Sequence, residues 1–212
     1  MKKIRLKIPL TEKNILSLNL GDLVYFDGPI FTVRSLFHIR AIRENILPPL
    51  DFEKMNVMIH MGPAMRRGDN RWIPVSCDPT TSMRFEKYTA DIIPKLGLKA
   101  IVGKGSMGLK TMEAAKKFKC VHLAKIGIYG NILASKATQV LGVYGLEELG
   151  PIECTWVLDV RDFGPFLVDI DAQGQSFFTD LKHKTQEKLS AVYRNFSIPD
   201  GFQFSSDFKL NH

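Results

Sequence analysis

The sequence has few cysteines, and they are far apart. Among 212 residues there are 3 cysteines, at Cys77, Cys120 and Cys154. An odd number at such wide spacing is unlike a disulfide framework, and no Cys-x-x-Cys pair indicates a zinc site. We therefore expect ordinary reduced thiols, mostly buried, and no metal bound by this chain.

Long hydrophobic runs are also lacking. The segment Leu23–Phe26 is typical, and it is far shorter than the ~20 residues that a membrane-spanning helix needs. The first ten residues are basic, but charge interrupts them before a signal-peptide core can form. We expect a cytoplasmic protein with no membrane partner.

Positive charge is what the chain has in excess. Lysine and arginine number 29 against 22 acidic residues, which gives a net charge of +7, and 45% of the residues are hydrophobic. This composition predicts a folded domain with an anionic partner, either a nucleic acid, an acidic membrane surface or a small carboxylate or phosphate. A nucleic-acid binder would need basic residues interleaved with aromatic ones or a reading helix, and neither is evident.

The hydrophobic pattern predicts a mixed α/β fold. A strand, a glycine-rich loop, a helix and a second strand follow one another over residues 100–124, which is typical of a βαβ unit in a parallel sheet. Other strands look antiparallel, and an amphipathic helix near the C-terminus would pack on its own body or on a partner. The expected strands are 23–26, 30–33, 57–61, 72–75, 100–102, 120–124, 155–160 and 166–170, and the expected helices are 11–18, 35–44, 82–95, 109–119, 131–137 and about 181–196.

Residues Gly103–Gly108 read Gly-Lys-Gly-Ser-Met-Gly and match the dinucleotide pattern G-x-G-x-x-G. The acidic residue expected about 20 residues further on is missing, and the spacing does not fit a Walker A loop. Two interpretations stay open. The motif is either a simple glycine turn or an anion site in which Lys104 and free backbone N–H groups bind a carboxylate.

The segment Asp78–Arg84 reads Asp-Pro-Thr-Thr-Ser-Met-Arg at the start of an expected helix. Helix capping explains one hydroxyl but explains three in a row less well. Arg84 lies in the first turn, where the helix dipole disfavours a cation unless an anion binds there. Both a capping and a functional interpretation stay open.

Histidine and arginine residues around position 36 form a third candidate site. Taken alone, Arg34 and Arg40 read as solvated surface and His38 as a core histidine. Arg66, Arg67 and Arg71 read as a solvated hairpin tip.

Taken together, these segments resemble one family. The β subunit, or C-terminal domain, of the iron–sulfur hydro-lyases class I fumarase and L-tartrate dehydratase is similar from about Gly21 to Gly174. The matching segments, in family order and spacing, are Thr32-x-Arg34-x3-His38-x-Arg40, Gly62-Pro63, Pro79-Thr-Thr-Ser82-x-Arg84, Ile101–Gly108, Leu146–Gly150, Trp156 and Phe163–Asp171.

The resemblance implies a swivelling β/β/α domain over residues 1–178, followed by a C-terminal helix and tail over residues 179–212. It also implies that the chain is part of an enzyme. A separate α subunit would carry a [4Fe–4S] cluster whose open iron acts as a Lewis acid, and this chain alone would bind none. A higher αβ oligomer is expected.

The resemblance also assigns roles to single residues. Arg34, Arg84 and Lys104 would bind the substrate carboxylates, and Thr80 and Thr81 would lie beside the reacting carbon. Supporting roles are expected for His38, which would orient Arg34, and for Ser82, Gly103 and Gly105.

The leading function from this resemblance is reversible hydration of fumarate to malate. The alternatives are an L-tartrate dehydratase β subunit and a non-catalytic anion-binding or assembly module of the same fold. Ser35 and Asp78 stand where the family commonly has aspartate and glycine, which favours the non-catalytic module, and Tyr129 adds bulk that would narrow the pocket.

Overall fold

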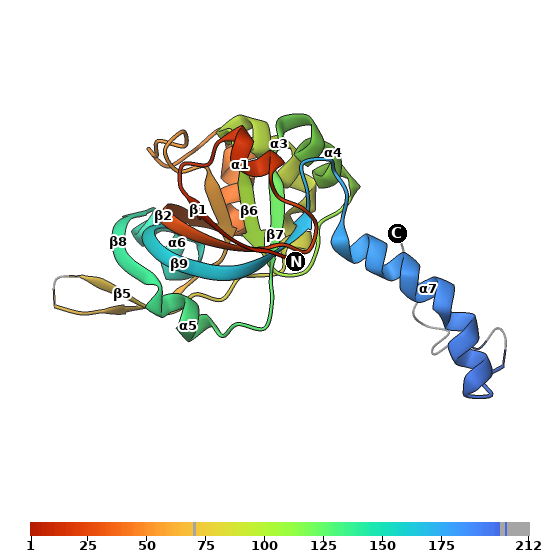
Figure 1. Ribbon diagram of the computed structural model, residues 1–212. Helices are drawn as coiled ribbons and strands as arrows, with labels where there is room; N and C mark the ends of the chain where they lie inside the picture. Colours follow the sequence, from red (N-terminus) through yellow and green to blue (C-terminus); the bar gives the residue numbers. More distant parts are fainter. Residues whose placement is uncertain (70, 200–201, 203–212) are drawn as a thin grey trace. The chain divides into compact units, whose positions relative to one another are not determined.

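The computed structural model describes residues 1–69, 71–199 and 202 (Figure 1). The chain divides into two compact units, Met1–Phe177 and Phe178–His212. The division expected from the family, between residues 178 and 179, stays a prediction about domains. The first unit contains the sheet and the candidate site.

A seven-stranded mixed sheet forms the centre of the first unit. The central strands are parallel and the last two are antiparallel to their neighbours, which confirms the mixed α/β class. A separate hairpin has two further strands. In spatial order the sheet strands are β1 (Lys3–Lys7), β2 (Leu23–Val33), β3 (Val57–His60), β6 (Ala100–Gly103), β7 (Val121–Lys125), β9 (Thr155–Ile170) and β8 (Ala137–Tyr144), and the hairpin strands are β4 (Ala64–Arg67) and β5 (Trp72–Ser76).

The sheet closes on itself, because β2 also pairs antiparallel with β9. This pairing joins β2, β3, β6, β7 and β9 into a ring. One hydrophobic core takes alternate residues from all five strands, among them Phe26, Ile59, Val102, Leu123 and Phe166. Successive side chains of a strand point to opposite faces, so the residues in between supply a second core on the other face.

Helices cover that second face. Met58 and Ile101 from the strands pack with Ile92 and Ala114 from the helices, and α3 and α4 lie side by side there (Figure 1). The helices are α1 (Glu12–Leu16), α2 (Ser35–Ile39) continued by a π-helical turn η1 (Arg40–Glu44), a 3-10 turn η2 (Ser82–Phe85) continued by α3 (Glu86–Leu96), α4 (Leu109–Phe118), α5 (Gly130–Ser135), α6 (Leu146–Glu153) and α7 (Phe177–Asn195).

Two expected turns prove to be bends inside single long strands. The predicted turn at residues 27–29 lies within β2, and the predicted break at Gly164-Pro165 lies within β9. Gly28 has a φ of +114°, and the pairing of β2 with β9 shifts register on its N-terminal side. The residues that predicted a turn therefore form a β-bulge, and the strand continues through it.

The C-terminal helix α7 forms as predicted. No described side chain of α7 is buried, and Leu181, Leu189 and Val192 are 49%, 41% and 44% exposed. The packing of this apolar stripe stays a prediction. In the residues that the structure describes, no helix is both long and apolar enough to cross a membrane.

Candidate functional site

The candidate site lies where the parallel strands end. Arg34 directly follows β2, His60 ends β3, Lys104 directly follows β6 and Lys125 ends β7. Because these four strands are neighbours and run in the same direction, the four residues lie along one edge of the sheet. Ligands of open parallel sheets bind at this carboxyl edge.

The Pro-Thr-Thr-Ser segment is held against the same edge by backbone hydrogen bonds. Thr80 N donates to His60 O at 2.6 Å, Lys104 N donates to Thr80 O at 3.1 Å, and Ser82 N donates to Lys104 O at 3.0 Å. Thr81 thereby forms a parallel bridge with Lys104. Residues that the sequence places more than twenty positions apart are thus brought together as one short ladder.

The side chains of this ladder are left available for a ligand. Thr80 and Thr81 are half-buried, whereas Arg84 and Lys104 are exposed. Within the described residues, neither Arg84 nor Lys104 forms an ion pair, and neither threonine hydroxyl forms a hydrogen bond. Two cations without an ion pair and two hydroxyls without a hydrogen bond therefore belong to the two segments that the backbone ladder joins.

Arg34 forms an ion pair with the last residue of helix α6. Its Nε lies 3.3 Å from Glu153 Oε1, and Glu153 Oε2 accepts a hydrogen bond from Leu36 N at 2.9 Å. A Cβ at Gly62 would lie 2.4 Å from Ile152 O and 2.7 Å from Arg34 Cδ, so only glycine fits between them. The family commonly has an aspartate at the position of Ser35, directly after the arginine. In this chain the carboxylate beside Arg34 comes from Glu153 instead.

Within the described residues the His38 ring forms no hydrogen bond to Arg34, although His38 N donates to Arg34 O at 3.4 Å, and its expected role in orienting Arg34 stays a prediction. Its ring is fully buried and stacks on Phe85 with centroids 4.6 Å apart, and neither ring nitrogen has a hydrogen-bond partner among the described residues. Burial lowers the pKa of His38 to about 3, which keeps the ring neutral. His38 is therefore a core side chain.

The glycine motif leads into helix α4, whose first N–H groups are already hydrogen-bonded, whereas the anion site expected at Lys104 stays a prediction. Glu86, the first residue of α3, occupies the N-terminus of α4. Its carboxylate accepts hydrogen bonds from Gly108 N at 2.8 Å, Thr111 N at 3.2 Å and Thr111 Oγ1 at 2.6 Å. A Cβ at Gly108 would lie 2.7 Å from Glu86 Oε1, so that glycine makes room for a carboxylate of the chain itself. Neither a dinucleotide phosphate nor a substrate carboxylate can use this helix end.

Asp78, which stands where the family commonly has glycine, forms an ion pair. Its carboxylate forms an ion pair with the Lys125 ammonium at the end of β7. The negative charge is therefore compensated locally, and the pair ties the start of the Pro-Thr-Thr-Ser segment to the sheet. Tyr129, expected to narrow the site, is 73% exposed.

The cysteines do not suit a cluster. Cys77 and Cys154 belong to one hydrophobic core and Cys120 to the other. Burial raises the pKa of Cys77 and Cys120 to about 12 and that of Cys154 to about 11, which disfavours the thiolate that metal binding needs. No group of three or more His, Cys, Asp or Glu side chains in the described part of the chain is arranged to hold a metal ion.

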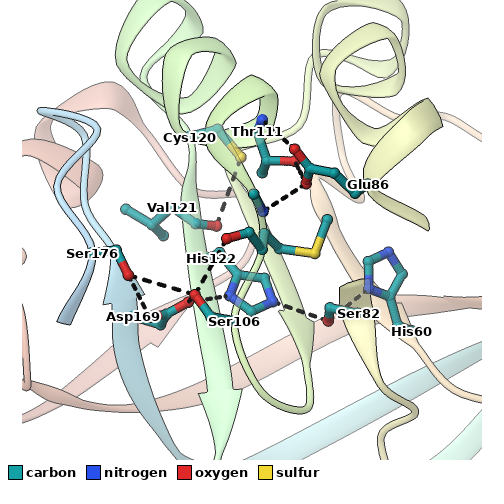
Figure 2. A network of polar contacts seen from close by, with 12 residues as sticks. His60, Ser82, Glu86, Ser106, Thr111, Cys120, Val121, His122, Asp169 and Ser176 are labelled. Atoms are coloured by element: carbon teal, nitrogen blue, oxygen red, sulfur yellow. Dashed lines mark hydrogen bonds and ion pairs between the residues drawn. The ribbon is translucent and has the colours of Figure 1, made fainter. Parts of the chain in front are cut away.

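Beneath the ladder lies a buried polar network that sequence reasoning missed (Figure 2). Ser82 Oγ lies 3.0 Å from His60 Nδ1 and 3.0 Å from His122 Nε2. His122 Nδ1 lies 3.0 Å from Asp169 Oδ2, which also accepts a hydrogen bond from Ser106 Oγ at 2.7 Å. The network therefore begins in the Pro-Thr-Thr-Ser loop and ends in the Gly-Lys-Gly-Ser loop.

One further contact completes the surroundings of Asp169. Ser176 Oγ donates to Asp169 Oδ1 at 3.2 Å, so both carboxylate oxygens are hydrogen-bonded although the residue is fully buried. In the sequence, the only signal for these residues was a polar side chain in an otherwise apolar strand, as with His60 in β3, His122 in β7 and Asp169 in β9. No motif spacing connects them.

The fold and the site define a class of protein: an α/β domain that carries cationic and hydroxyl side chains in loops at the carboxyl edge of parallel strands. Comparison with known proteins narrows the class. Residues 1–181 match the family described as "Fumarase C-terminus", and the chain belongs to this family. The family expected from the sequence motifs is confirmed.

Three named relatives differ in how much of their own length aligns with this chain. It is 35% identical to the "Putative L(+)-tartrate dehydratase subunit beta" of Methanocaldococcus jannaschii, over 86% of this chain and 95% of that protein. It is 34% identical to the "L(+)-tartrate dehydratase subunit beta" of Escherichia coli strain K12, over 91% and 94%. With the "Putative fumarate hydratase class I" of Geobacillus stearothermophilus it shares 37% identity over 88% of this chain but only 36% of that protein.

Proposed function

We propose that this chain is the β subunit of a hydro-lyase that interconverts fumarate and malate. The observation that carries the proposal is the backbone ladder between Thr80–Ser82 and Lys104 at the carboxyl edge of the sheet. It joins the two most specific motifs of the sequence. The family to which the chain belongs and the named activities of its relatives support the same conclusion.

The charges suit a C4 dicarboxylate. Such a substrate carries two negative charges, and Arg34, Arg84 and Lys104 would bind its two carboxylates. Arginine can donate two parallel hydrogen bonds to one carboxylate, which fixes its orientation as well as its position. Holding both ends of the substrate sets the geometry of the carbons between them, as elimination of water requires.

Proton transfer at the carbon is assigned to a threonine of the ladder. Thr80 or Thr81 would hold or move the proton at its Oγ1 atom. A neutral threonine hydroxyl is a weak base, so it needs activation by a stronger base supplied by the partner subunit. The half-buried position of both residues limits the water that would compete for that proton.

The chain would act together with an α subunit that carries a [4Fe–4S] cluster, in a higher αβ oligomer. Two observations support this division. The tartrate dehydratase relatives are named as beta subunits, and the class I fumarase relative is much longer than this chain. The cluster, when bound by the partner, supplies a Lewis acid for the substrate hydroxyl. A cytoplasmic location is part of the proposal.

L(+)-tartrate is the second candidate substrate. The two tartrate dehydratase subunits align over 94% or more of their own length, whereas the fumarase aligns over about a third of its length. A non-catalytic module is the third alternative, and its main support is weakened. Asp78 is neutralised by Lys125, and Glu153 replaces the missing acid beside Arg34.

The test is turnover by the reconstituted complex. The chain is co-expressed with its cognate cluster-bearing subunit, purified without oxygen, and assayed with fumarate, malate and L-tartrate. We expect kcat/KM for fumarate and malate to exceed that for tartrate. The reverse order identifies a tartrate dehydratase, and a cluster-loaded complex that turns over none of the three contradicts the proposal.

A further inference from the structure

The buried network below the ladder has one consistent arrangement of hydrogens when both histidines are neutral. Asp169 Oδ2 accepts the Nδ1–H of His122, which leaves His122 Nε2 as an acceptor. Ser82 O–H then donates to that nitrogen, and His60 Nδ1–H donates to Ser82 Oγ. Each donor is used once, so the whole chain of hydrogen bonds has a single direction from His60 to Asp169.

The three groups Ser82, His122 and Asp169 share the order of a nucleophilic triad, but Ser82 cannot act as one. Its side chain is fully buried. A Cβ at Gly103 would lie 1.6 Å from Ser82 Oγ, which shows how closely the backbone of β6 covers the hydroxyl. No substrate atom can approach Ser82, so the network acts on the site through the loops that it holds.

Both of those loops carry residues of the proposed substrate site. Ser82 directly follows Thr80 and Thr81, and its backbone N–H bonds to Lys104 O. Ser106 lies two residues after Lys104, beyond Gly105, whose φ of +71° marks a loop that a side chain would strain. The bond from Ser106 to Asp169 fixes this loop two residues after the exposed Lys104.

We propose that His60, Ser82, His122, Asp169 and Ser106 form a positioning relay that fixes the threonine loop and the lysine loop in one shared geometry for the dicarboxylate. The proposal rests on the proposed function and deepens it by naming residues that never touch substrate. Every member except Ser106 is almost completely buried. Burial also keeps the pKa of His60 well below its usual value, which favours the neutral ring that the arrangement of hydrogens requires.

A double-mutant cycle in the reconstituted complex tests the relay. Ser82→Ala breaks it in the threonine loop, and Ser106→Ala breaks it in the lysine loop. We expect each to lower kcat/KM about 10-fold to 100-fold, because small misplacements of positioning groups are costly. The double variant should lose much less than the product of the single losses, since one break already frees the loops.

The matched control is Thr89→Val. This change removes a fully buried hydroxyl that bonds to Phe85 O at 2.9 Å and has no contact with the relay. It should leave kcat/KM within about 2-fold. If Ser82→Ala does not fold, Ser106→Ala carries the test alone, because Ser106 is only partly buried. An increase in KM for that variant, with its melting temperature preserved, is then the expected result.

Nitrogen-15 NMR of the histidine rings in the full chain gives a second, independent measurement. In the wild type we expect His60 and His122 both to be protonated at Nδ1, and we expect Ser82→Ala to shift both rings. The relay is contradicted if the losses in kcat/KM of Ser82→Ala and Ser106→Ala multiply in the double variant, or if the histidine rings are protonated at Nε2. The proposed function stands in either case, provided that the wild-type complex is active. A wild-type complex inactive on all three substrates contradicts the proposed function, and with it the catalytic purpose of the relay.

Discussion

At the residue scale, the site depends on small side chains as much as on charged ones. Gly103 leaves space for the Ser82 hydroxyl, and Gly62 lets the Ile152 backbone approach Arg34. Each of these glycines lies beside a residue whose position the site requires. The exposed side chain of Lys104 extends from a backbone that these contacts and the ladder hydrogen bonds hold in place.

Removal of either exposed cation should abolish turnover and leave the fold intact. Arg84→Ala and Lys104→Ala remove the charge that would bind a carboxylate, and we expect kcat/KM to fall about 100-fold or more. Both side chains are exposed, so the free energy of unfolding should change by less than about 0.5 kcal/mol. Steady-state kinetics of the complex and urea denaturation of the chain measure the two effects.

Lys110→Ala is the control for these variants, because Lys110 is an exposed lysine on α4 near the same loop. Its kinetics should match the wild type. If Arg84→Ala or Lys104→Ala unfolds the chain, that residue is structural and its assignment as a carboxylate-binding group is wrong.

Gly103→Ala should destabilise the chain through Ser82. The new Cβ would overlap Ser82 Oγ, and overpacking of this kind costs about 1–3 kcal/mol. In a Ser82→Ala background the nearest atom is Ser82 Cβ, at 3.0 Å, so the cost should be clearly smaller. A double-mutant cycle by urea denaturation measures the difference, and strictly additive free energies would contradict the contact.

At the element scale, strand ends and helix starts decide which groups are free to bind. The N-terminus of α4 follows a glycine-rich loop and would suit an anion, yet Glu86 of α3 already occupies it. Arg34 and Lys104 directly follow the carboxyl ends of β2 and β6. The proposed function therefore places anion binding at the strand ends and not at the helix.

Glu86→Ala should remove this cap and lower the free energy of unfolding by about 1–2 kcal/mol. Glu86→Gln keeps an acceptor but loses the charge, so its effect should be smaller. Urea denaturation of both variants is compared with Glu113→Gln, which alters an exposed glutamate of α4. Equal stability of Glu86→Ala and the control would contradict the cap.

The elements also show what the sequence can predict. Helix α4 and strand β5 lie where apolar spacing places them, whereas Arg66 and Arg67, expected at the hairpin tip, lie within strand β4. The edge strands β1 and β8 were missed, because mostly exposed or half-exposed residues give them no continuous apolar signal.

The candidate site divides in the same way. Thr80 and Lys104 lie in loops marked by proline or glycine, and Arg34 belongs to a Thr-x-Arg-x3-His pattern directly after a strand, so motifs locate them. His122 and Asp169 lie inside strands far apart in the chain, and the pairing of β7 with β9 joins them. Local motifs do not reveal which residues of two distant strands lie side by side.

At the scale of the whole molecule, buried histidines link stability to pH. Burial lowers the pKa of His38 to about 3 and that of His60 well below its usual value. Both rings are therefore neutral in the folded chain but take up protons in the unfolded chain below about pH 6.5. The unfolded state then binds more protons, so stability falls as the pH decreases from about 6.5 toward 3.

His38→Phe should reduce this dependence. The ring has no hydrogen-bond partner among the described residues and stacks on Phe85, so phenylalanine fits the same surroundings. We expect the pH slope of the unfolding free energy in that window to fall by up to about 1.4 kcal/mol per pH unit. Denaturation from pH 7 to pH 4.5 measures it, and an unchanged slope would show that His38 does not remain neutral.

The distribution of the net charge of +7 is also a property of the whole molecule. Several cations are neutralised within the fold, as Lys125 is by Asp78 and Arg40 by Glu148. Arg84 and Lys104 form no ion pair within the described residues, and the backbone ladder joins the segments to which they belong. Part of the excess charge therefore belongs to the two segments of the candidate site.

A crystal structure of the anaerobically purified complex with a bound C4 dicarboxylate tests this account most directly. We predict carboxylate oxygens within about 3 Å of the Arg84 guanidinium and the Lys104 ammonium, with Arg34 on the same ligand. A dicarboxylate bound to the cluster-bearing subunit without contact to any of these three residues would contradict it.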